Sequence, residues 1–334
     1  MRSSLREAIH KLDVLLAPLV LSAFSEKNAL STYLFHSLFR DNNELSENLA
    51  DPQQQVTLQV FRRFVEYHYK KGHVFVSPAD ILKGLDPDKK YVLITFDDGY
   101  YNNIRALPIL EEYQAPALFF ISANHVLEGR SFWWDVVYRE GMKAGKTDKQ
   151  IDQEKSILLK LTDDAIQEHL VRQYGPNCMQ PVSDADRPFT ASELKEFAQH
   201  PLVTIGNHTC DHAVLTNYTP QQISQQITDA QLKLETITGY RPESIAYPCG
   251  EYNEYVLQAS ADAGIKMGIT INHAKNFSSS LHNTSNMLTL NRFTIWGNEP
   301  LKGQCDFYRS DYHLLDTMRG LYHTILNKPK LPAV

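Results

Sequence analysis

The stretch YVLITFDDGYYN, residues 91–102, decides the fold. Val92 to Phe96 form a continuous apolar or β-branched run that ends in two adjacent carboxylates and a glycine. A run without polar alternation is typical of a strand buried on both faces in a parallel sheet. Like charges at the mouth of a core repel each other and lose hydration, so Asp97 and Asp98 require a compensating cation or arginine. An Asp-Gly turn with solvated acids is the alternative interpretation.

The composition is that of a soluble protein with one large domain or two ordinary ones. The chain has 334 residues, of which 43% are hydrophobic and 22% charged. The formal net charge of -6 and the lack of a basic stripe argue against nucleic acid as a partner. The four cysteines lie far apart without a CxxC pair, which excludes a disulfide scaffold and a cysteine-based zinc site. This cysteine usage indicates a reducing compartment.

The N-terminal segment KLDVLLAPLVLSAF, residues 11–24, has some features of a signal peptide. Glu7 and Asp13 dilute its positive charge, Pro18 interrupts the apolar run, and that run is too short to span a membrane. We therefore expect a helical extension over residues 1–30 that packs on the domain or makes a peripheral membrane contact. A cytoplasmic location follows as the expectation.

Strand-like and helix-like segments alternate along most of the chain, which predicts an α/β fold with parallel strands. The predicted strands are 32–39, 92–96, 116–122, 202–207, 244–248, 266–271 and 287–296. The predicted helices are 56–72, 103–113, a short one from 190, 219–239 and 253–263. Residues 129–187 are polar and helical without a strand signal, and so predict an insertion. A helix and a loose tail are expected over 315–334.

A second group of polar residues follows the strand predicted at 202–207. In GNHTCDH, residues 206–212, His208 and His212 are four apart, which places both imidazoles on one face of a helical turn. Such a pair suits one cation, although unrelated surface or core histidines are the alternative. Ligands gather at the carboxyl ends of parallel strands, where both the histidines and the Asp97–Asp98 pair are expected.

Three motifs in order resemble one known family. TFDDG and HTCDH are similar to the first two motifs of the polysaccharide deacetylases, the NodB-homology or carbohydrate esterase family four group. RPESIAYPCGEYN, residues 241–253, resembles the third motif in a variant with a Tyr-Pro-x-Gly core. The resemblance covers about residues 30–300 apart from the insertion. It implies a distorted (β/α) barrel of NodB-homology type, with the deacetylase domain over residues 31–314.

The resemblance also implies a set of roles at the site. Asp98, His208 and His212 would bind one divalent metal ion, and Asp97 would be the general base. An Asp/His2 set fits Zn2+, with Co2+ or Ni2+ as alternatives, and leaves a position open for a water whose pKa the cation lowers. Adjacent strand residues point to opposite sides, so Asp98 is expected to face the metal while Asp97 faces the water.

The chain departs from the family pattern at two motifs. Ala246 stands where an arginine normally orients the base, and Arg292 in the last predicted strand is our candidate to replace it as a catalytic residue. A purely structural salt bridge is the alternative for Arg292. The fifth-motif histidine, which normally protonates the leaving amine, is absent from LTLNR. The remaining candidates for the acid are Asp97 itself and the nearby His273 and His282.

The expected substrate contacts come from two stretches of the chain. Trp134 in SFWWDVVY lies beside the insertion, and an aromatic face is a common platform for a sugar, although packing into the core is the alternative. Tyr100 and Tyr247 are expected to wall the groove together with Pro248 and Cys249. A backbone N–H between residues 247 and 249 would bind the oxyanion by family analogy. Cys249 is expected to be a small buried residue and not a nucleophile.

These features predict a metal-dependent hydrolase that removes an N-acetyl group from an acetamido sugar. Such an enzyme is an amide hydrolase acting on linear C–N bonds other than peptide bonds. The substrate would be an acetylated sugar or glycan of a bacterial surface glycan or its precursor. Hydrolysis of a non-sugar amide on the same fold is one alternative. A non-catalytic glycan-binding module is the other, suggested by the missing fifth-motif histidine.

Overall fold

The computed structural model describes residues 3–277, 281 and 284–313. It divides into two compact units, one formed by Asn28–Asn298 and the other by Met1–Lys27 together with Glu299–Val334. The sequence prediction ended the main domain at residue 314, whereas the structure groups residues 299–313 with the N-terminal helix. The helix and tail predicted over 315–334 lie outside the described residues.

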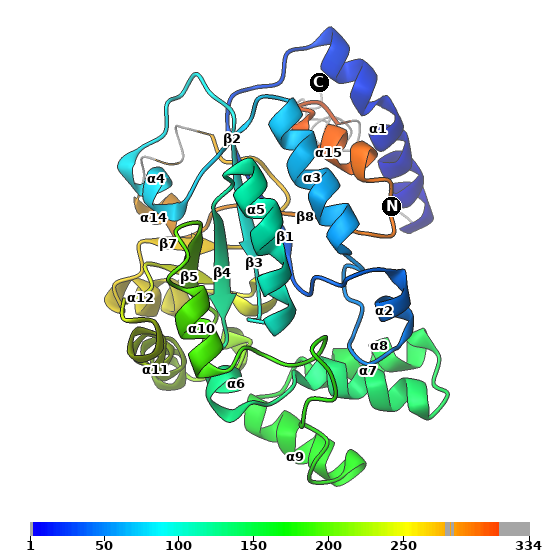
Figure 1. Cartoon of the computed structure of the whole chain (residues 1–334), viewed down its shortest axis with the longest axis vertical. Coiled ribbons are helices and arrows are strands. Elements are labelled where there is room, and N and C mark those ends of the chain that lie inside the picture. Colours follow the sequence, from blue (N-terminus) through cyan, green and yellow to red (C-terminus); the bar gives the residue numbers. More distant parts are fainter. Residues whose placement is uncertain (1–2, 278–280, 282–283, 314–334) are drawn as a thin grey trace, which may run out of the picture. The chain divides into compact units, whose positions relative to one another are not determined.

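The larger unit is built on a curled, fully parallel sheet (Figure 1). Its strands follow the order β7-β6-β5-β4-β3-β1-β8, and β2 pairs with the first part of β3. The strands are β1 Leu30–Phe35, β2 Val74–Phe75, β3 Tyr91–Phe96, β4 Ala117–Ile121, β5 Val203–Asn207, β6 Ser244–Ala246, β7 Met267–Ile269 and β8 Phe293–Thr294. This architecture confirms the predicted α/β fold of distorted-barrel, NodB-homology type.

The strands most relevant to the site are continuous apolar runs. Every residue of β1, β3 and β4 is buried, which explains why their sequences do not alternate. The first strand ends at Phe35, so the prediction of a strand over 32–39 is wrong in its second half. His36 therefore lies just beyond the carboxyl end of β1, next to the end of β3.

A short segment connects the two edges of the curled sheet. The N–H of Leu290 donates to the carbonyl of Gly268 at 2.8 Å, beside β7, and the N–H of Arg292 donates to Asn272 at 2.9 Å. The chain then enters β8, in which Phe293 pairs with Tyr33 of β1. Arg292 thus sits where the segment passes from one edge of the sheet to the other.

The prediction of one strand over 287–296 is wrong in extent. Thr284–Met287 form the short helix α14, and only Phe293–Thr294 form strand β8. The side chain of Asn276 accepts from the N–H of Asn291 at 2.8 Å and donates to its carbonyl at 3.0 Å. This amide replaces the hydrogen bonds that a neighbouring strand would supply.

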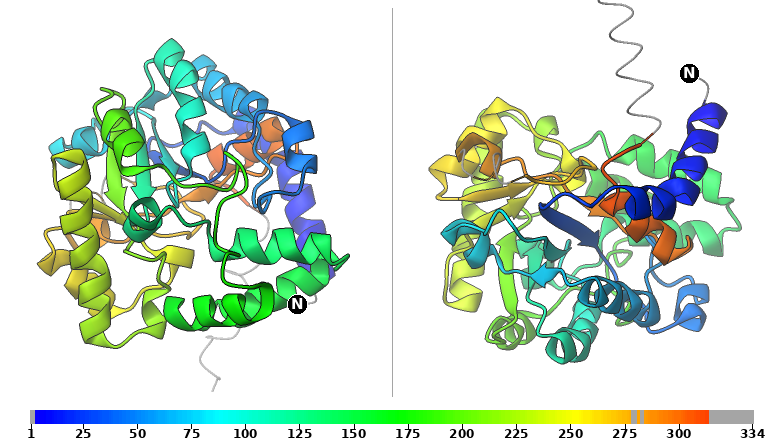
Figure 2. Two further views of the ribbon diagram at one scale, coloured as in Figure 1. Left: turned by 60° about the horizontal axis from the view of Figure 1, so that its bottom comes forward. Right: turned by 90° about the horizontal axis from the view of Figure 1, so that it is seen from above.

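Helices cover the outside of the sheet (Figure 2). They are α2 Asn42–Ser46, α3 Leu58–Lys70, α4 Pro78–Lys83, η1 Tyr101–Ala106, α5 Leu107–Tyr113, α6 Ala123–Glu128, α10 Ala191–Phe197, η2 Leu215–Asn217, α11 Pro220–Thr238, η3 Pro248–Gly250 and α12 Glu254–Asp262. The prediction for 219–239 is confirmed, because the Thr219 side chain caps the N–H of Gln222 and Gly239 ends the helix at a φ of +86°.

The segment predicted as an insertion consists of three helices and the loops that join them. It contains α7 Trp133–Lys143, α8 Asp148–Leu158 and α9 Asp163–Tyr174, and no strand interrupts residues 129–187, all of which the structure describes. These helices lie together beyond the carboxyl ends of β3 and β4 (Figure 1). Their cluster of buried side chains includes Trp133, Trp134 and Tyr100.

The smaller unit consists of two helices and their flanking segments. Helix α1, Ser3–Ala23, packs along α15, Leu301–Arg309. Arg309 holds the carboxylate of Glu26 through two nitrogens, at 2.8 and 3.0 Å. No helix among the described residues is long and apolar enough to cross a membrane.

The contact between Gly206 of β5 and Phe120 of β4 gives a stability prediction. A Cβ added at Gly206 would lie 2.5 Å from Cδ1 of the buried Phe120, so we expect Gly206→Ala to lower the free energy of unfolding by about 1–3 kcal/mol through overpacking. Denaturant unfolding measures the change. Thr204→Ala on the same strand is the control and should cost less than about 1 kcal/mol. Equal unfolding midpoints for Gly206→Ala and the wild type would contradict this account of the packing.

Candidate active site

The chain leaves the extended conformation immediately after β3. The N–H of Gly99 donates to the carbonyl of Asp97 at 3.0 Å, and Asp98 between them has a φ of +77°, which together form a γ-turn. Gly99 follows with a φ of +94°. Asp tolerates such values better than most residues, and glycine adopts them freely. The DDG sequence is therefore suited to this turn.

The turn brings both carboxylates to one cavity, which Asp97 and Asp98 line together. The prediction that strand alternation would point them to opposite sides is wrong, because β3 ends at Phe96, before either residue. The two carboxylates differ instead in the groups that each of them contacts.

Asp97 is held by Arg292. The guanidinium donates from Nη1 to Oδ1 and from Nη2 to Oδ2, both at 2.7 Å, in a two-pronged ion pair. Its remaining donors contact the Thr95 hydroxyl at 3.0 Å and the Thr270 carbonyl at 3.2 Å. The arginine is 1% exposed, so this pair is shielded from water. Arg292 therefore lies beside Asp97, where the sequence analysis expected it.

The charge state of Asp97 follows from these contacts. Burial by itself raises the pKa of this carboxyl, but the positive charges of Arg292 and His208 more than offset burial and hold the pKa below its ordinary value. Asp98 is governed by the same balance. Burial raises its pKa, and nearby histidines, His36 foremost, lower the pKa well below its usual range. Both groups are therefore carboxylates at neutral pH.

The two histidines converge through a turn and not through a helix. Thr209 and His212 have φ values of +65° and +53°, so the predicted helical turn is wrong. Side chains fix the turn instead: Asn207 Oδ1 accepts from the N–H of Thr209 at 2.7 Å, and Thr209 Oγ1 accepts from the N–H of Ala213 at 2.8 Å. The polar residues between the histidines are thus structural.

Asp211 ties this turn to its surroundings. Its Oδ1 accepts from Arg130 at 2.7 Å and from Asn124 at 2.6 Å, and its Oδ2 accepts from Gln226 at 2.7 Å. Arg130 also pairs with Asp163 of α9. The insertion and the histidine turn are therefore connected through a single guanidinium.

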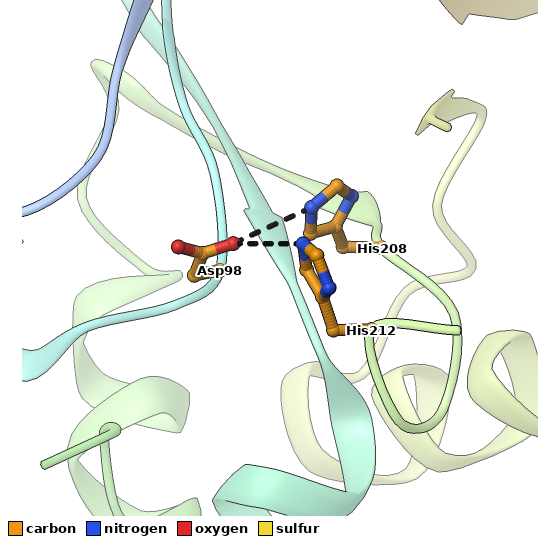
Figure 3. A group of neighbouring side chains, drawn as sticks. All are labelled: Asp98, His208 and His212. Atoms are coloured by element: carbon orange, nitrogen blue, oxygen red, sulfur yellow. Dashed lines mark ion pairs between the residues drawn. The ribbon is translucent and has the colours of Figure 1, made fainter. Parts of the chain in front are cut away.

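Asp98, His208 and His212 form a group suited to one metal ion (Figure 3). Oδ1 of Asp98 lies 3.5 Å from Nε2 of His208 and 3.4 Å from Nε2 of His212. Two ligands of a tetrahedral zinc ion, each about 2.0–2.1 Å from it, lie about 3.3 Å apart. Asp98 Oδ1 is also buried and accepts no hydrogen bond among the described residues. The donor types, their spacing and this unsatisfied oxygen all fit a bound cation.

Contacts with neighbouring groups orient the two histidine rings toward Asp98. Nδ1 of His208 donates to the carbonyl of Ala246 at 2.8 Å, which directs Nε2 toward Asp98. The His212 ring packs edge-on against Trp134, with centroids 4.6 Å apart. Burial lowers the pKa of His212 to about 4 despite the opposing charge of Asp98, so this ring is neutral as a ligand must be. Burial also lowers the pKa of His208, but the two carboxylates raise it further, to above its ordinary value.

The cavity at the site has a volume of about 660 Å³, and it contains only some of the predicted substrate contacts. Trp134, Tyr247 and Cys249 line it, whereas Tyr100 and Pro248 do not. Tyr100 is fully buried because its ring belongs to the core of the insertion. The structure therefore does not place Tyr100 where it could contact a substrate directly, and Tyr100 instead supports a residue that lines the cavity.

A hydrogen bond from Trp134 to Tyr100 holds the indole ring in place. The Tyr100 hydroxyl accepts from the indole Nε1 of Trp134 at 2.8 Å and donates to Oδ2 of Asp135 at 2.8 Å. Trp134 is itself 7% exposed and lines the cavity, so it both packs in the core and faces the site. The core-packing interpretation of SFWWDVVY is confirmed for this residue, and its contact with a sugar stays a prediction.

Cys249 lies at a corner of the third motif. Its φ of +57° turns the chain between Pro248 and Gly250. Burial, together with the neighbouring carboxylate of Asp98, raises the pKa of its thiol to about 12. The side chain is therefore a neutral thiol at neutral pH, in line with the expectation that Cys249 is not a nucleophile.

Sequence reasoning missed several residues that line the cavity, among them His36 and Gln53. Nδ1 of His36 lies 2.8 Å from Oε1 of Gln54, whose Nε2 donates to the carbonyl of Leu34 at 3.1 Å. This arrangement places the proton on Nδ1. Gln53 Nε2 lies 3.4 Å from Oδ2 of Asp98. The position of His36 after the β1 run was the signal available, because β1 neighbours β3 in the sheet.

Of the two histidines considered as proton donors, His273 and His282, the structure describes His273. His273 lines the cavity, and its Nε2 lies 3.3 Å from Oγ1 of Thr294. His282 lies outside the described residues.

Comparison with known proteins assigns this fold to a family. The sequence model of the Polysaccharide deacetylase family matches residues 84–268, more than half of the chain, and the chain belongs to this family. Among individual relatives, YxkH of Bacillus subtilis (strain 168), provisionally named a polysaccharide deacetylase, is 25% identical over 252 residues. The match covers 74% of this chain and 66% of YxkH, so the chain spans slightly under two thirds of that relative.

Solved structures share the fold. The deacetylase PplD of Streptococcus pyogenes, solved in complex with acetate, has a TM-score of 0.57 at 19% identity, with 84% of this chain and 99% of that chain covered. A de-N-acetylase of Aggregatibacter actinomycetemcomitans has a TM-score of 0.54 at 16% identity, with 84% and 100% covered. IcaB of Ammonifex degensii has a TM-score of 0.55 at 14% identity, with 85% and 98% covered.

The ligand group makes a prediction about metal binding. Asp98→Asn and His212→Ala each remove one donor, and we expect Zn2+ affinity, measured by isothermal titration calorimetry, to fall by at least about 100-fold. Asp97→Asn is the matched control, because it changes the neighbouring carboxylate and keeps all three donors. Similar losses for Asp97→Asn and Asp98→Asn would contradict the division between the two acids.

The buried ion pair makes a prediction about stability. Arg292→Met leaves the Asp97 charge buried and unpaired, so we expect the free energy of unfolding in chelator to fall by about 3–5 kcal/mol. The double variant Asp97→Leu/Arg292→Met removes both charges and should be more stable than Arg292→Met alone. A double variant that is less stable than the single one would show that the pair is not the source of the loss.

Proposed function

We propose that this chain is a metal-dependent deacetylase that removes the N-acetyl group from an acetamido sugar of a bacterial surface glycan or its precursor. The observation that carries the proposal is the buried Asp97–Arg292 pair beside the Asp98–His208–His212 group in one cavity. A base and a metal-binding group that share a cavity are the parts that hydrolysis of an amide requires. The similarity to a de-N-acetylase of the same fold agrees with this reaction.

The proposed cofactor is one divalent cation, with Zn2+ ahead of Co2+ and Ni2+. One carboxylate and two imidazoles form a donor set typical of these ions. A cation held by Asp98, His208 and His212 would supply a Lewis acid that polarises the acetamide carbonyl and makes water more acidic.

Asp97 is the proposed proton carrier. As a carboxylate it accepts the proton of the water that attacks the acetamide carbon. Because Arg292 and His208 keep the pKa of Asp97 low, the carboxyl group then readily gives this proton to the departing amine. One residue thus supplies both steps, and acetate and the free amine are the products.

The backbone of the third motif provides a candidate donor for the oxyanion. The hydrogen bonds of η3 run from Gly250 to Tyr247 and from Glu251 to Pro248, so they do not use the N–H of Cys249. Cys249 lines the cavity. We assign its N–H to the developing negative charge of the acetamide oxygen.

The geometry favours a sugar hydrolase over the two alternatives. A binding module has no use for a desolvated carboxylate clamped by an arginine beside its metal site. The aromatic walls formed by Trp134, Tyr247 and Trp296 suit the apolar face of a sugar ring better than a small cyclic amide.

The base assignment is tested by acetate release from N-acetylated mono- and oligosaccharides. For Asp97→Asn we expect kcat to fall by about 10²–10⁴-fold, because the amide cannot accept the proton. The Zn2+ content of the same preparation, measured by elemental analysis, is the control for an intact site. Unchanged acetate release at full metal content would sink the assignment of Asp97.

The transfer of the proton to the departing amine is tested on His36 and His273, the two cavity histidines outside the metal-binding group. His36→Gln and His273→Gln should each keep kcat within about tenfold of the wild type, since Asp97 carries the proton to the amine. Steady-state kinetics with the same substrate measures both. A loss at either histidine as large as that of Asp97→Asn would assign the proton donor to that histidine.

A further inference from the structure

Arg130 links two carboxylates that come from distant parts of the chain. Its Nη2 donates to Oδ1 of Asp211 at 2.7 Å and to Oδ2 of Asp163 at 3.2 Å, and its Nη1 donates to Oδ1 of Asp163 at 3.4 Å. Asp163 begins helix α9 of the insertion, whereas Asp211 directly precedes His212 of the metal-binding group. The exposed carboxylate of Glu128 lies 2.7 Å from Nε. Arg130 itself is 7% exposed, so water and salt screen these ion pairs only weakly.

The acids Asp163 and Asp211 would repel each other without this guanidinium. Both accept from the same nitrogen, so their oxygens lie close together. Burial raises the pKa of Asp163 although Arg130 opposes this effect, and the charge of Asp211 raises it further. Asn124 and Gln226, which also donate to the Asp211 carboxylate, are neutral side chains. Arg130 therefore supplies the positive charge that lets the insertion pack against the histidine turn.

His212 depends on this turn more than His208 does. His208 directly follows strand β5, and its Nδ1 donates to the carbonyl of Ala246. For His212, Nδ1 is buried and makes no hydrogen bond among the described residues. Its backbone has a φ of +53°, a conformation that costs free energy in a residue other than glycine and persists only where neighbouring groups hold it. The position of the His212 ring is therefore set by its packing on Trp134 and by the backbone that Asp211 anchors.

We propose that Arg130 is a positioning residue of the metal site, which holds Asp211 against Asp163 and thereby keeps Nε2 of His212 where it binds the divalent cation. Arg130 is not a member of the metal-binding group and acts on it through Asp211. This inference rests on the proposed metal-dependent function, and it adds a residue of the insertion on which the affinity for the metal depends.

The sign of the effect separates positioning from simple electrostatics. A guanidinium repels a nearby divalent cation, so the loss of its charge alone would raise the affinity for Zn2+. The loss of the contact with Asp211 has the opposite effect, because His212 is then held less firmly and one of the three ligands is weakened. Positioning thus predicts weaker metal binding after the removal of a positive charge.

The first test measures Zn2+ affinity by isothermal titration calorimetry. For Arg130→Met we expect the affinity to fall about tenfold or more. Arg130→Lys keeps the positive charge but lacks the fork that reaches two carboxylates, so it should recover part of this loss and still bind Zn2+ about threefold or more weakly than the wild type. Because Arg130→Lys keeps a cation in the network, it carries the test if Arg130→Met does not fold.

Arg139→Met is the matched control for the loss of a buried ion pair. Arg139 lies in the same insertion, is 3% exposed, and pairs through Nη1 with Oδ2 of Asp186 at 2.7 Å. Its removal also leaves a buried carboxylate without its arginine, but at a distance from the histidine turn. We expect the Zn2+ affinity of Arg139→Met to stay within about twofold of the wild type.

The second test asks whether Arg130 acts through Asp211. Asp211→Asn keeps the size of the side chain but removes the charge that the guanidinium holds, and it should lower Zn2+ affinity by about threefold or more. In the double variant Arg130→Met/Asp211→Asn the two losses should not add, because both changes break the same contact. Fully additive losses would overturn the route through Asp211.

The visible absorption of the Co2+-loaded protein is a readout that a general loss of stability does not change. The d–d bands of this ion depend on the geometry of its ligands. We expect Arg130→Met to alter the spectrum and Arg139→Met to keep that of the wild type.

The outcomes distinguish this inference from the proposed function. Unchanged or higher Zn2+ affinity in Arg130→Met, or an equal loss in Arg139→Met, would overturn the positioning role and leave the deacetylase function standing. Wild-type protein that binds none of Zn2+, Co2+ and Ni2+ would overturn the metal site and, with it, both proposals.

Discussion

The site depends on how two consecutive carboxylates are stabilised at the end of a buried strand. Asp97 is satisfied on both oxygens by Arg292, which leaves Asp98 as the acid facing the two histidines. Because the two carboxylates have different partners, they cannot exchange roles. The γ-turn at Asp98 brings both to one cavity, and the ion pair with Arg292 then distinguishes Asp97 from Asp98.

The position of the arginine follows from the curled sheet. At Ala246 of β6 the family resemblance predicts an arginine, and the backbone carbonyl of this alanine orients His208 instead. Arg292 reaches Asp97 from the opposite edge, because its segment passes from β7 to β1. The curl of the sheet thus allows a residue between β7 and β8 to supply the positive charge beside Asp97.

The sequence predicted those parts of the site that depend on residue type and strand position. Asp97, Asp98, His208 and His212 follow buried strands, and the sheet brings strand ends together. The left-handed conformations at Asp98 and His212 could not be predicted, because they depend on local turns closed by neighbouring groups. The burial of Tyr100 was missed for a related reason, since its direction is set by Asp135 and Trp134, more than thirty residues away.

The insertion connects the 42–55 segment to the metal-binding group. Trp134 packs on His212, its indole donates to Tyr100, and the Tyr100 hydroxyl donates to Asp135. Asp135 in turn accepts from the N–H of Asp51, in the 42–55 segment. A continuous series of contacts therefore runs from the 42–55 segment through the insertion to the imidazole of His212. A displacement of the insertion would be transmitted along these contacts to the His212 ring, so the position of the insertion and the geometry of the Asp98–His208–His212 group constrain each other.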